Sequence, residues 1–154
     1  KPESKDTVQY MLQNISLLGD KLGPVLFQLP PNMQKDLDRL RTFLDFLPHG
    51  RRFAFEFRHS SWFDEDVVDA LRAKDAALTI IDQDDFATPP IASASWGYLR
   101  LHRLDYGAQA LADWAERVKE QTWSETYVYF KHDEGIGSGP PAVDEFLKLI
   151  PGTT

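Results

Sequence analysis

The sequence predicts an α/β fold in which helices and parallel strands alternate within one domain. Short apolar segments that suit strands alternate with segments whose apolar residues recur at helical spacing. The connections between successive predicted strands are long enough to hold a helix, as parallel pairing requires. No linker, repeat or low-complexity block divides the 154 residues, so we expect a single domain over residues 1–154.

The elements of the first half are recognised by apolar spacing and by the residues that end them. Apolar residues three and four apart predict two helices, which end at Gly19 and at Pro48. Ser61 is suited to cap a third helix, whose acidic first turn favours the positive end of the helix dipole. The predicted elements of this half are a helix at 8–18, a strand at 25–29, a helix at 37–47, a strand at 53–57 and a helix after residue 61.

The second half continues the same alternation with three more strands. A loop rich in Asp, Pro, Ser and Ala interrupts it at 83–95, and a glycine-rich loop lies at 135–139. The predicted elements are strands at 77–81, 98–102 and 127–130, and helices at 111–118 and 143–150. The chain therefore contains five predicted strands.

Composition limits the class of function. The net charge of -7 argues against broad binding to nucleic acid or to an anionic membrane, which requires a basic surface. No apolar run approaches the length of a membrane span. The chain has no cysteine, which excludes disulfides and thiolate chemistry and fits a cytoplasmic location. These limits leave a small-molecule ligand open as a partner.

Polar residues at alternate strand positions favour a barrel over an open doubly wound sheet. Strands of an open parallel sheet are covered by helices on both faces and are apolar almost throughout. Here Gln28, Glu56 and Arg100 each lie between two apolar strand residues, and His102 follows Arg100 in phase. An apolar face toward helices and a mixed inner face are typical of a barrel, whose active site lies at the strand ends.

Four ordered motifs resemble those of a known family. They are LGPVLFQLPP (22–31), FAFEFRHSSWF (53–63), YLRLH (98–102) and YVYFKHD (127–133). The order and spacing are similar to the YecE-like family, also called domain of unknown function 72. The resemblance implies a TIM-type (β/α) barrel of eight strands, of which this chain holds strands four to eight. It also implies a missing N-terminal part, or another chain, that covers the open sheet edges.

The resemblance brings no established activity, and the chain departs from the family pattern at two loops. Members usually have a glycine after the Arg-Leu-His motif, where this chain has Arg103. The last strand usually continues into an asparagine-rich turn, where this chain has Lys131 and His132 before Asp133. Both departures lie where the barrel interpretation places the ligand site.

Glu56 is the central candidate for a catalytic role. It alternates with phenylalanines in a predicted strand, and Arg58 follows on the same face. An arginine beside a buried carboxylate keeps it ionised, which suits a general base. The competing interpretation is a structural ion pair inside the barrel, because buried charges require partners.

Histidines and aspartates at other strand ends complete the candidate site. His102 is a candidate general acid or base, aligned by Asp82 or Glu56. His59 and Asp133 are candidate ligand-binding residues, with a structural hydrogen bond as the alternative for His59. We assign no metal ligand, because no pair of these residues has a diagnostic spacing.

Anion-binding and stacking residues are the remaining candidates. The run GIGSGPP (135–141) precedes a helix and is near Arg100 and Arg103 in the predicted barrel, which suits a phosphate, although a simple loop is the alternative. Aromatic residues that can stack on a planar or sugar ligand are Trp62, Phe86 and Tyr129, unless they belong to the core. Gln28 and Arg58 are added as polar contacts to the ligand.

Three function classes remain open. The first is an enzyme acting on a small anionic or polar metabolite, with Glu56 and His102 in proton transfer and Arg58 and Arg100 holding negative charge. The second is a non-catalytic binding or structural barrel with the same lining. The third is a metal-dependent nucleic-acid hydrolase, which the net charge disfavours. No dinucleotide fingerprint, Ser-His-Asp order or zinc spacing is present, so the sequence names no cofactor.

Overall fold

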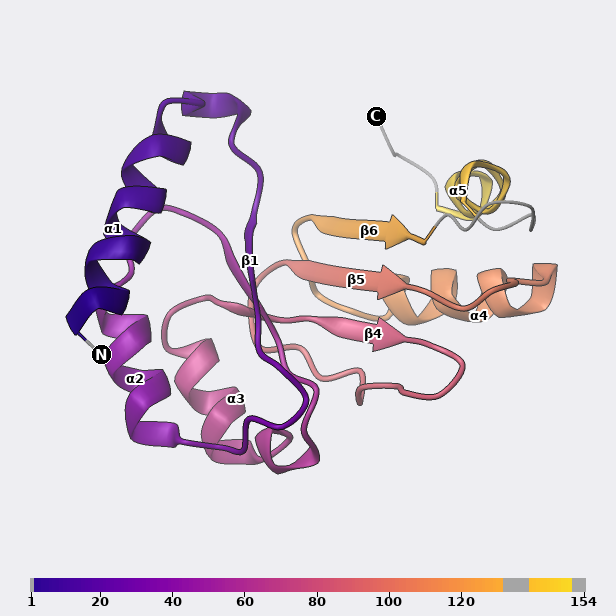
Figure 1. Cartoon of the computed structure of the whole chain (residues 1–154). Coiled ribbons are helices and arrows are strands. Elements are labelled where there is room, and N and C mark those ends of the chain that lie inside the picture. The colour runs from indigo at the N-terminus through magenta and orange to yellow at the C-terminus, as the bar shows by residue number, and fades with distance from the viewer. Residues whose placement is uncertain (1, 132–138, 151–154) are drawn as a thin grey trace.

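The computed structural model describes residues 2–131 and 139–150 (Figure 1). Helices and strands alternate along the chain, as the apolar spacing predicts. In chain order they are α1 (Pro2–Ser16), β1 (Val25–Gln28), α2 (Leu37–Phe46), β2 (Phe53–Glu56), α3 (Glu65–Arg72), β3 (Ala77–Leu78), β4 (Ile80–Asp82), β5 (Gly97–Leu101), α4 (Ala108–Lys119), β6 (Thr126–Phe130) and α5 (Pro140–Leu149). Short 3₁₀ turns, η1 (Gly19–Lys21) and η2 (Ser60–Trp62), follow α1 and precede α3.

All strand pairs are parallel, and spatial order follows chain order. One sheet has the order β1-β2-β3 and the other has the order β4-β5-β6. This order lacks the reversal that marks a doubly wound sheet. The α/β class is thereby confirmed, while the described residues form no closed barrel, because β1 and β6 stand at sheet edges.

The predicted strand at 77–81 is a single extended segment that changes partner at Thr79. Its first part, β3, pairs with β2, and its second part, β4, pairs with β5. The Thr79 amide donates to the Phe55 carbonyl at 2.8 Å, so the segment remains continuous. Loop hydroxyls bind two of its other amides: Ser93 Oγ accepts from Leu78 N at 2.7 Å, and Thr88 Oγ1 accepts from Ile81 N at 2.8 Å. These hydroxyls satisfy backbone groups that would otherwise be buried without a partner.

Helices cover one face of the strands, and the apolar core lies between them. In one half, Phe53 and Phe55 are buried with residues of α2 and α3, such as Leu44 and Leu71. In the other half, Leu99 and Leu101 are buried with residues of α4 and α5. Figure 1 shows α2 and α3 beside the first strands and α4 and α5 beside the last. Phe55 and Leu101, which alternate with Glu56 and Arg100, thus face helices, in agreement with the predicted apolar strand face.

The opposite strand face is partly apolar and partly polar, and we call it the inner face. Its apolar layer contains Ala54, Ala77, Trp96 and Tyr98, with Tyr127 packed against them. Side chains alternate between faces along a strand. The polar residues two positions further along β2 and β5 therefore lie beside this layer, toward the carboxyl ends of the strands.

The cap of α3 differs from the sequence prediction. The side chain of Asp64 accepts from the amide of Asp66, so Asp64 is the N-cap. Ser61 lies in η2 instead, and its hydroxyl accepts from the amide of Lys35 at 2.8 Å. Ser61 and Asp64 are both residue types that cap helices, and spacing alone did not identify which of them does so here.

Among residues 2–131 and 139–150, none of the helices combines the length and apolar character that crossing a membrane requires.

Candidate functional site

Glu56, at the end of β2, is a fully buried carboxylate held by two arginines. Its Oε1 accepts from Nε of Arg58 at 2.8 Å, and its Oε2 pairs with Nη1 of Arg100. The same Nη1 of Arg100 also donates to Oε1 of Gln28 at 3.3 Å. We call the three charged residues the Glu56 clamp. The structure thus brings together four of the residues that the sequence predicted to converge.

The charges of the Glu56 clamp do not cancel. A buried carboxylate is tolerated only when it is paired and hydrogen-bonded, and here both oxygens have guanidinium partners. The arginine side chains retain 31% and 23% of their exposure, so water or a ligand can reach them. One negative and two positive charges leave the clamp with a net charge of about +1.

Strand alternation and sheet curvature explain how this clamp forms. Gln28 and Glu56 are register partners on β1 and β2, and Arg100 is the register partner of Ile81 on β4. The segment β3–β4 therefore lies between the strands that carry Glu56 and Arg100. Gln28 lies one strand further away and still contacts Arg100. Such contacts across intervening strands are expected on the concave side of a strongly twisted sheet.

His102 follows Arg100 in phase and belongs to the same face. Burial lowers the pKa of its imidazole from the ordinary value, and the positive charge of Arg100 lowers it further, against the opposing effect of Glu56. The imidazole is therefore neutral near pH 7 and can accept a proton. No side-chain bond joins it to Glu56, so the structure places it near the clamp without the predicted alignment by that carboxylate.

Two tyrosines extend the inner face beside Arg100. Tyr129 is the register partner of Arg100 on β6, and its side chain is 44% exposed. Its ring lies 5.1 Å from that of Tyr98 between centroids, with 33° between the planes. Burial, and secondarily Tyr129, raises the pKa of Tyr98 to about 12, so that phenol remains neutral. Tyr129 is thus the one predicted stacking residue that faces the candidate site among the described residues.

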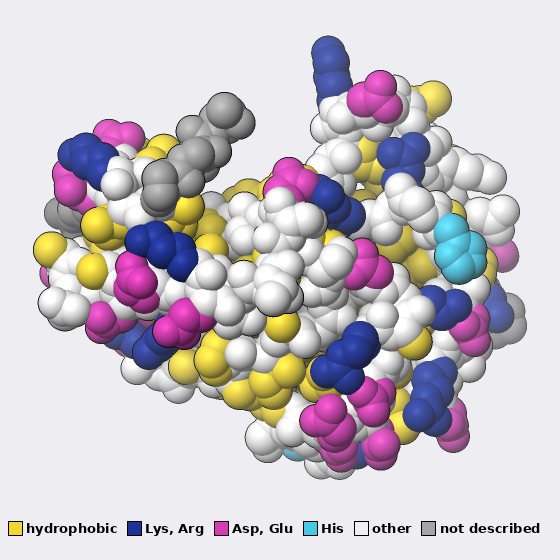
Figure 2. Space-filling model, turned by 180° about the vertical axis from the view of Figure 1, so that it is seen from behind, with side chains coloured by type: hydrophobic (Ala, Val, Ile, Leu, Met, Phe, Trp, Pro, Cys, Tyr) yellow, Lys and Arg dark blue, Asp and Glu magenta, His cyan; other side chains and the backbone are white. Residues whose placement is uncertain are grey.

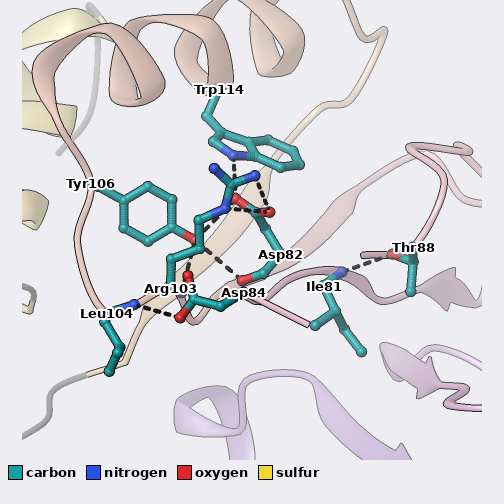
Figure 3. Close-up of polar contacts among 8 residues, drawn as sticks. All are labelled: Ile81, Asp82, Asp84, Thr88, Arg103, Leu104, Tyr106 and Trp114. Atoms are coloured by element: carbon teal, nitrogen blue, oxygen red, sulfur yellow. Dashed lines mark hydrogen bonds and ion pairs between the residues drawn. The ribbon is translucent and has the colours of Figure 1, made fainter. Parts of the chain in front are cut away.

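Asp82 lies in a separate buried cluster on the helix side of β4 (Figure 3). Its Oδ1 accepts from Nε of Arg103 at 2.9 Å and also bonds to Nη2 of Arg103 at 2.8 Å. Its Oδ2 accepts from the indole of Trp114 at 2.8 Å and from the hydroxyl of Tyr106 at 3.1 Å. Every contact of this carboxylate ties α4 or the loop before it to the strand.

This placement corrects the expectation that Asp82 aligns His102. Asp82 is in phase with Ile80, which packs in the helix-side core, whereas His102 is in phase with Arg100. The two residues are joined through the backbone, where the amide of His102 donates to the carbonyl of Asp82 at 2.7 Å. Both residues end strands, but the alternation of the pleat sends their side chains to opposite faces.

The other two residues predicted to stack on a ligand, Trp62 and Phe86, pack against aromatic rings of the protein instead. Trp62 is 3% exposed, stacks on Phe57 with centroids 4.5 Å apart, and donates its indole N–H to the carbonyl of Met33. Phe86 packs near Phe63, with centroids 6.3 Å apart. The alternative weighed for these aromatics, that they belong to the core, holds for Trp62.

His59 makes local hydrogen bonds. Its Nδ1 accepts from the amide of Ser61 at 3.2 Å and lies 2.9 Å from the hydroxyl of Ser61. A ring nitrogen that accepts from an amide carries no proton, so the neutral ring has its proton on Nε2. These contacts correspond to the structural alternative for this residue.

Several predicted residues lie outside the described part of the chain. Asp133, His132 and most of the glycine-rich loop are among residues 132–138. Within the described ranges, no group of three or more His, Asp or Glu residues is arranged to hold a metal ion.

On the face shown in Figure 2, basic side chains are interspersed with acidic ones and form no continuous basic surface.

Sequence reasoning missed a polar cluster at the opposite ends of the strands. Arg52 pairs with Glu125, donates to the hydroxyl of Tyr127 at 2.8 Å, and stacks its guanidinium over Trp96 at 5.7 Å from the ring centroid. Arg52, Trp96 and Glu125 directly precede β2, β5 and β6, and Tyr127 is the second residue of β6, so the cluster lies at the amino ends of the strands. Tyr127 and Tyr129 lie two positions apart in a predicted strand, and this spacing is the signal from which their position on one face of the strand could have been predicted.

The comparisons with known proteins agree with the four motifs. The family model described as "Protein of unknown function DUF72" matches residues 1–153. None of the curated proteins matches the chain. A crystal structure of a DUF72 family protein from Enterococcus faecalis V583 superposes with a TM-score of 0.79 and 16% identity, over 97% of this chain and 67% of that one.

Two further crystal structures show the same likeness. A second structure of the Enterococcus faecalis protein has a TM-score of 0.66 at 19% identity, covering 86% of this chain and 61% of that one. A DUF72 family protein from Thermotoga maritima MSB8 has a TM-score of 0.69 at 20% identity, covering 96% and 63% respectively. The chain thus spans 61–67% of the length of these relatives. At such identities the likeness establishes the fold.

Proposed function

Because the chain belongs to the DUF72 family, whose description states no activity, we propose its function from the site: a small anionic metabolite binds at the Glu56 clamp. The observation that carries this proposal is the fully buried carboxylate shared by Arg58 and Arg100 at the carboxyl ends of parallel strands. A structural pair needs one cation for one anion. The second arginine supplies a positive charge that the protein leaves uncompensated within the clamp.

The guanidinium groups keep donors for a ligand. An arginine has about five N–H donors, and each clamp arginine uses only one of its nitrogens on Glu56. Glu56 fixes both side chains in place before a ligand arrives, which reduces the entropy lost on binding. The clamp therefore has the features of a preorganised site for an oxyanion.

The location supports a TIM-type barrel as the complete fold. Spatial order that follows chain order, helices on one face and a polar inner face at the carboxyl ends of the strands are all features of that barrel. We infer that this chain carries strands four to eight of such a barrel, and that another segment or chain completes it. The DUF72 structures are longer than this chain, which is consistent with the inference.

His102 is the residue best placed for proton transfer. Its imidazole is neutral and half-buried, and it lies within electrostatic range of Glu56, Arg58 and Arg100. Both oxygens of Glu56 already accept from guanidinium groups, so this carboxylate acts by positioning the arginines. If the protein is an enzyme, we propose His102 as its general acid or base and Glu56 as a positioning residue.

A non-catalytic barrel is the second candidate, and one observation favours it. Among residues 2–131 and 139–150, no acidic side chain is bonded to His102, whereas general bases are usually oriented by a further group. On this reading the clamp holds the anion without transforming it. Retention of an isotopically labelled ligand without change during long incubation would support it.

Anion binding tests the proposal. Titration of the parent protein with acetate, followed by backbone amide shifts in NMR, should shift residues of β2 and β5. Arg100→Gln should weaken acetate binding about ten- to hundredfold, because hydrogen bonds to charged groups contribute about 1.5–3 kcal/mol. Arg41→Gln, at an exposed position on α2, is the matched control. Acetate binding that is unaltered in Arg100→Gln, or absent in the parent, contradicts the proposed function.

A further inference from the structure

Gln28 is the uncharged member of the polar group around Glu56. It is the last residue of β1, it is exposed, and it is the register partner of Glu56 on β2. Its Oε1 accepts from Nη1 of Arg100 at 3.3 Å, and the same nitrogen pairs with Oε2 of Glu56. Arg100 therefore reaches across the segment β3–β4 and is held by acceptors on two other strands, one charged and one neutral.

The contact with Arg100 fixes which way the Gln28 amide faces. A guanidinium can only donate, so the amide atom beside Nη1 is the oxygen, and the N–H₂ group remains as a donor. The other N–H groups of Arg58 and Arg100 are donors as well, whereas both oxygens of Glu56 already accept from these arginines. A ligand group that meets the clamp and Gln28 must therefore supply acceptor atoms, as a carboxylate does.

The neutrality of Gln28 decides how much positive charge remains for a ligand. An amide oxygen orients Arg100 without cancelling its charge, whereas a carboxylate in the same place would pair with it. Such a second carboxylate would lower the summed charge of the clamp and residue 28 from about +1 to about zero. The Arg100 side chain keeps only 23% of its exposure, so a charge beside it is screened less than one on an open surface.

We propose that Gln28 determines the charge selectivity of this site: it holds Arg100 through an uncharged acceptor and so leaves the charge of that guanidinium to a carboxylate ligand. This inference rests on the proposed function and deepens it, because it identifies the residue on which the selection of an anion over a neutral ligand depends. Gln28 acts through Arg100 and is thus a positioning residue.

This role predicts that stability and binding separate at position 28. Gln28→Glu has nearly the same shape and gives Arg100 a second charged acceptor. The variant should melt near the temperature of the parent, because pairing with Arg100 offsets the repulsion from Glu56. The added negative charge opposes a bound carboxylate, so the affinity for acetate should fall about tenfold or more. A residue that only supports the fold would lose stability together with binding.

Acetate titrations followed by backbone amide shifts in NMR, with thermal melts of each variant, test the inference on the whole chain. The parent should bind acetate in preference to acetamide, which has the same shape and no charge. Gln28→Met keeps the length of the side chain and removes the amide, so it should weaken acetate binding about two- to fivefold through one lost hydrogen bond. Gln13→Glu adds the same charge at an exposed position on α1 and, as the matched control, should bind acetate as the parent does.

The outcomes separate this inference from the proposed function. Acetate affinity that Gln28→Glu leaves unchanged, or lowers no more than Gln13→Glu does, overturns the role of Gln28 and leaves the anion site intact. Absence of acetate binding in the parent, or equal binding of acetamide, overturns both. If Gln28→Glu melts far below the parent, Gln28→Met decides: weaker acetate binding at a preserved melting temperature supports the role, whereas affinity like that of the parent, or a second large loss of stability, rejects it.

Discussion

Glu56 and Arg100 form an ion pair across an intervening strand segment that carries neither residue. Glu56 ends β2 and Arg100 lies in β5, while the segment β3–β4 runs between the two. The pair therefore links the two three-stranded sheets on their inner face. Because the carboxylate is 0% exposed, the link tolerates no loss of the negative charge without a cost in folding.

Replacement of that charge should destabilise the protein moderately. Glu56→Gln keeps the shape but directs an amide N–H₂ toward a guanidinium, which leaves at least one arginine without an acceptor. Partial exposure of both arginine side chains limits the loss to about 1–3 kcal/mol of the free energy of unfolding. Chemical denaturation measures this loss. Glu125→Gln, which removes the exposed partner of Arg52, should cost less than about 1 kcal/mol, and equal losses would contradict the role of burial.

Asp82→Asn should loosen α4 and the loop before it. Four donor contacts reach this carboxylate, and an amide in its place faces some of them with its own N–H groups. We expect a loss of about 1.5–3 kcal/mol in unfolding free energy, together with a shift of the Trp114 indole N–H resonance. Asp84→Asn is the control, because the amide oxygen can still accept from the Leu104 amide; a change above about 0.5 kcal/mol there would be unexpected.

Gly97→Ala should destabilise the first residue of β5. A Cβ at this position would lie 2.6 Å from Cε3 of Trp123, on a rigid ring. Overpacking of this kind typically costs about 1–3 kcal/mol. Thermal unfolding should show the loss, whereas Gly23→Ala, where a Cβ meets no atom within 4 Å, should change little. A melting temperature unchanged by Gly97→Ala would mean that the indole has another position available.

His102 should make stability depend on pH in the mildly acid range. Burial and Arg100 lower its folded pKa below the ordinary value near 6.5, so the unfolded state binds the proton more readily. This contribution to stability is complete above about pH 6.5, and it is lost as the pH falls from there through the folded pKa. His102→Asn should reduce the difference in denaturation midpoint between about pH 7.5 and about pH 5.5. His49→Asn, at an exposed position, is the control, and an equal reduction in both variants would refute the assignment.

Strand periodicity predicted much of the fold and the centre of the site. Alternation along FAFEF and YLRLH predicts that Glu56 and Arg100 each point away from the apolar, helix-facing side of their strand, and the two side chains are in contact on the inner face. The parallel order followed from the lengths of the connections. The predicted closed barrel is not confirmed, because the described residues form two three-stranded sheets with β1 and β6 at sheet edges.

The wrong predictions concern residues whose position in the sequence did not reveal the direction or the contacts of their side chains. Asp82 and His102 both end strands, yet they face opposite sides of the sheet, because Asp82 is an even number of residues from the helix-facing Ile80. Trp62 directly follows the polar residues Arg58 to Ser61 in the sequence, yet its side chain is buried and stacks on Phe57. Ser61 and Asp64 are both good helix caps, and tertiary contact with the amide of Lys35 decides between them.

The change of partner at Thr79 divides the structure into two halves, each with its own sheet and its own apolar core. One half contains β1 to β3 with the core of α2 and α3, and the other contains β4 to β6 with the core of α4 and α5. Between them run one continuous peptide segment, a small apolar layer and several ionic contacts, including Glu56–Arg100 and Arg52–Glu125. Opening of one half against the other therefore breaks these ionic contacts and exposes the apolar layer. Native-state hydrogen exchange should resolve two cooperative units. Added salt screens the ionic contacts between them, so it should weaken the coupling between the opening of one unit and the opening of the other.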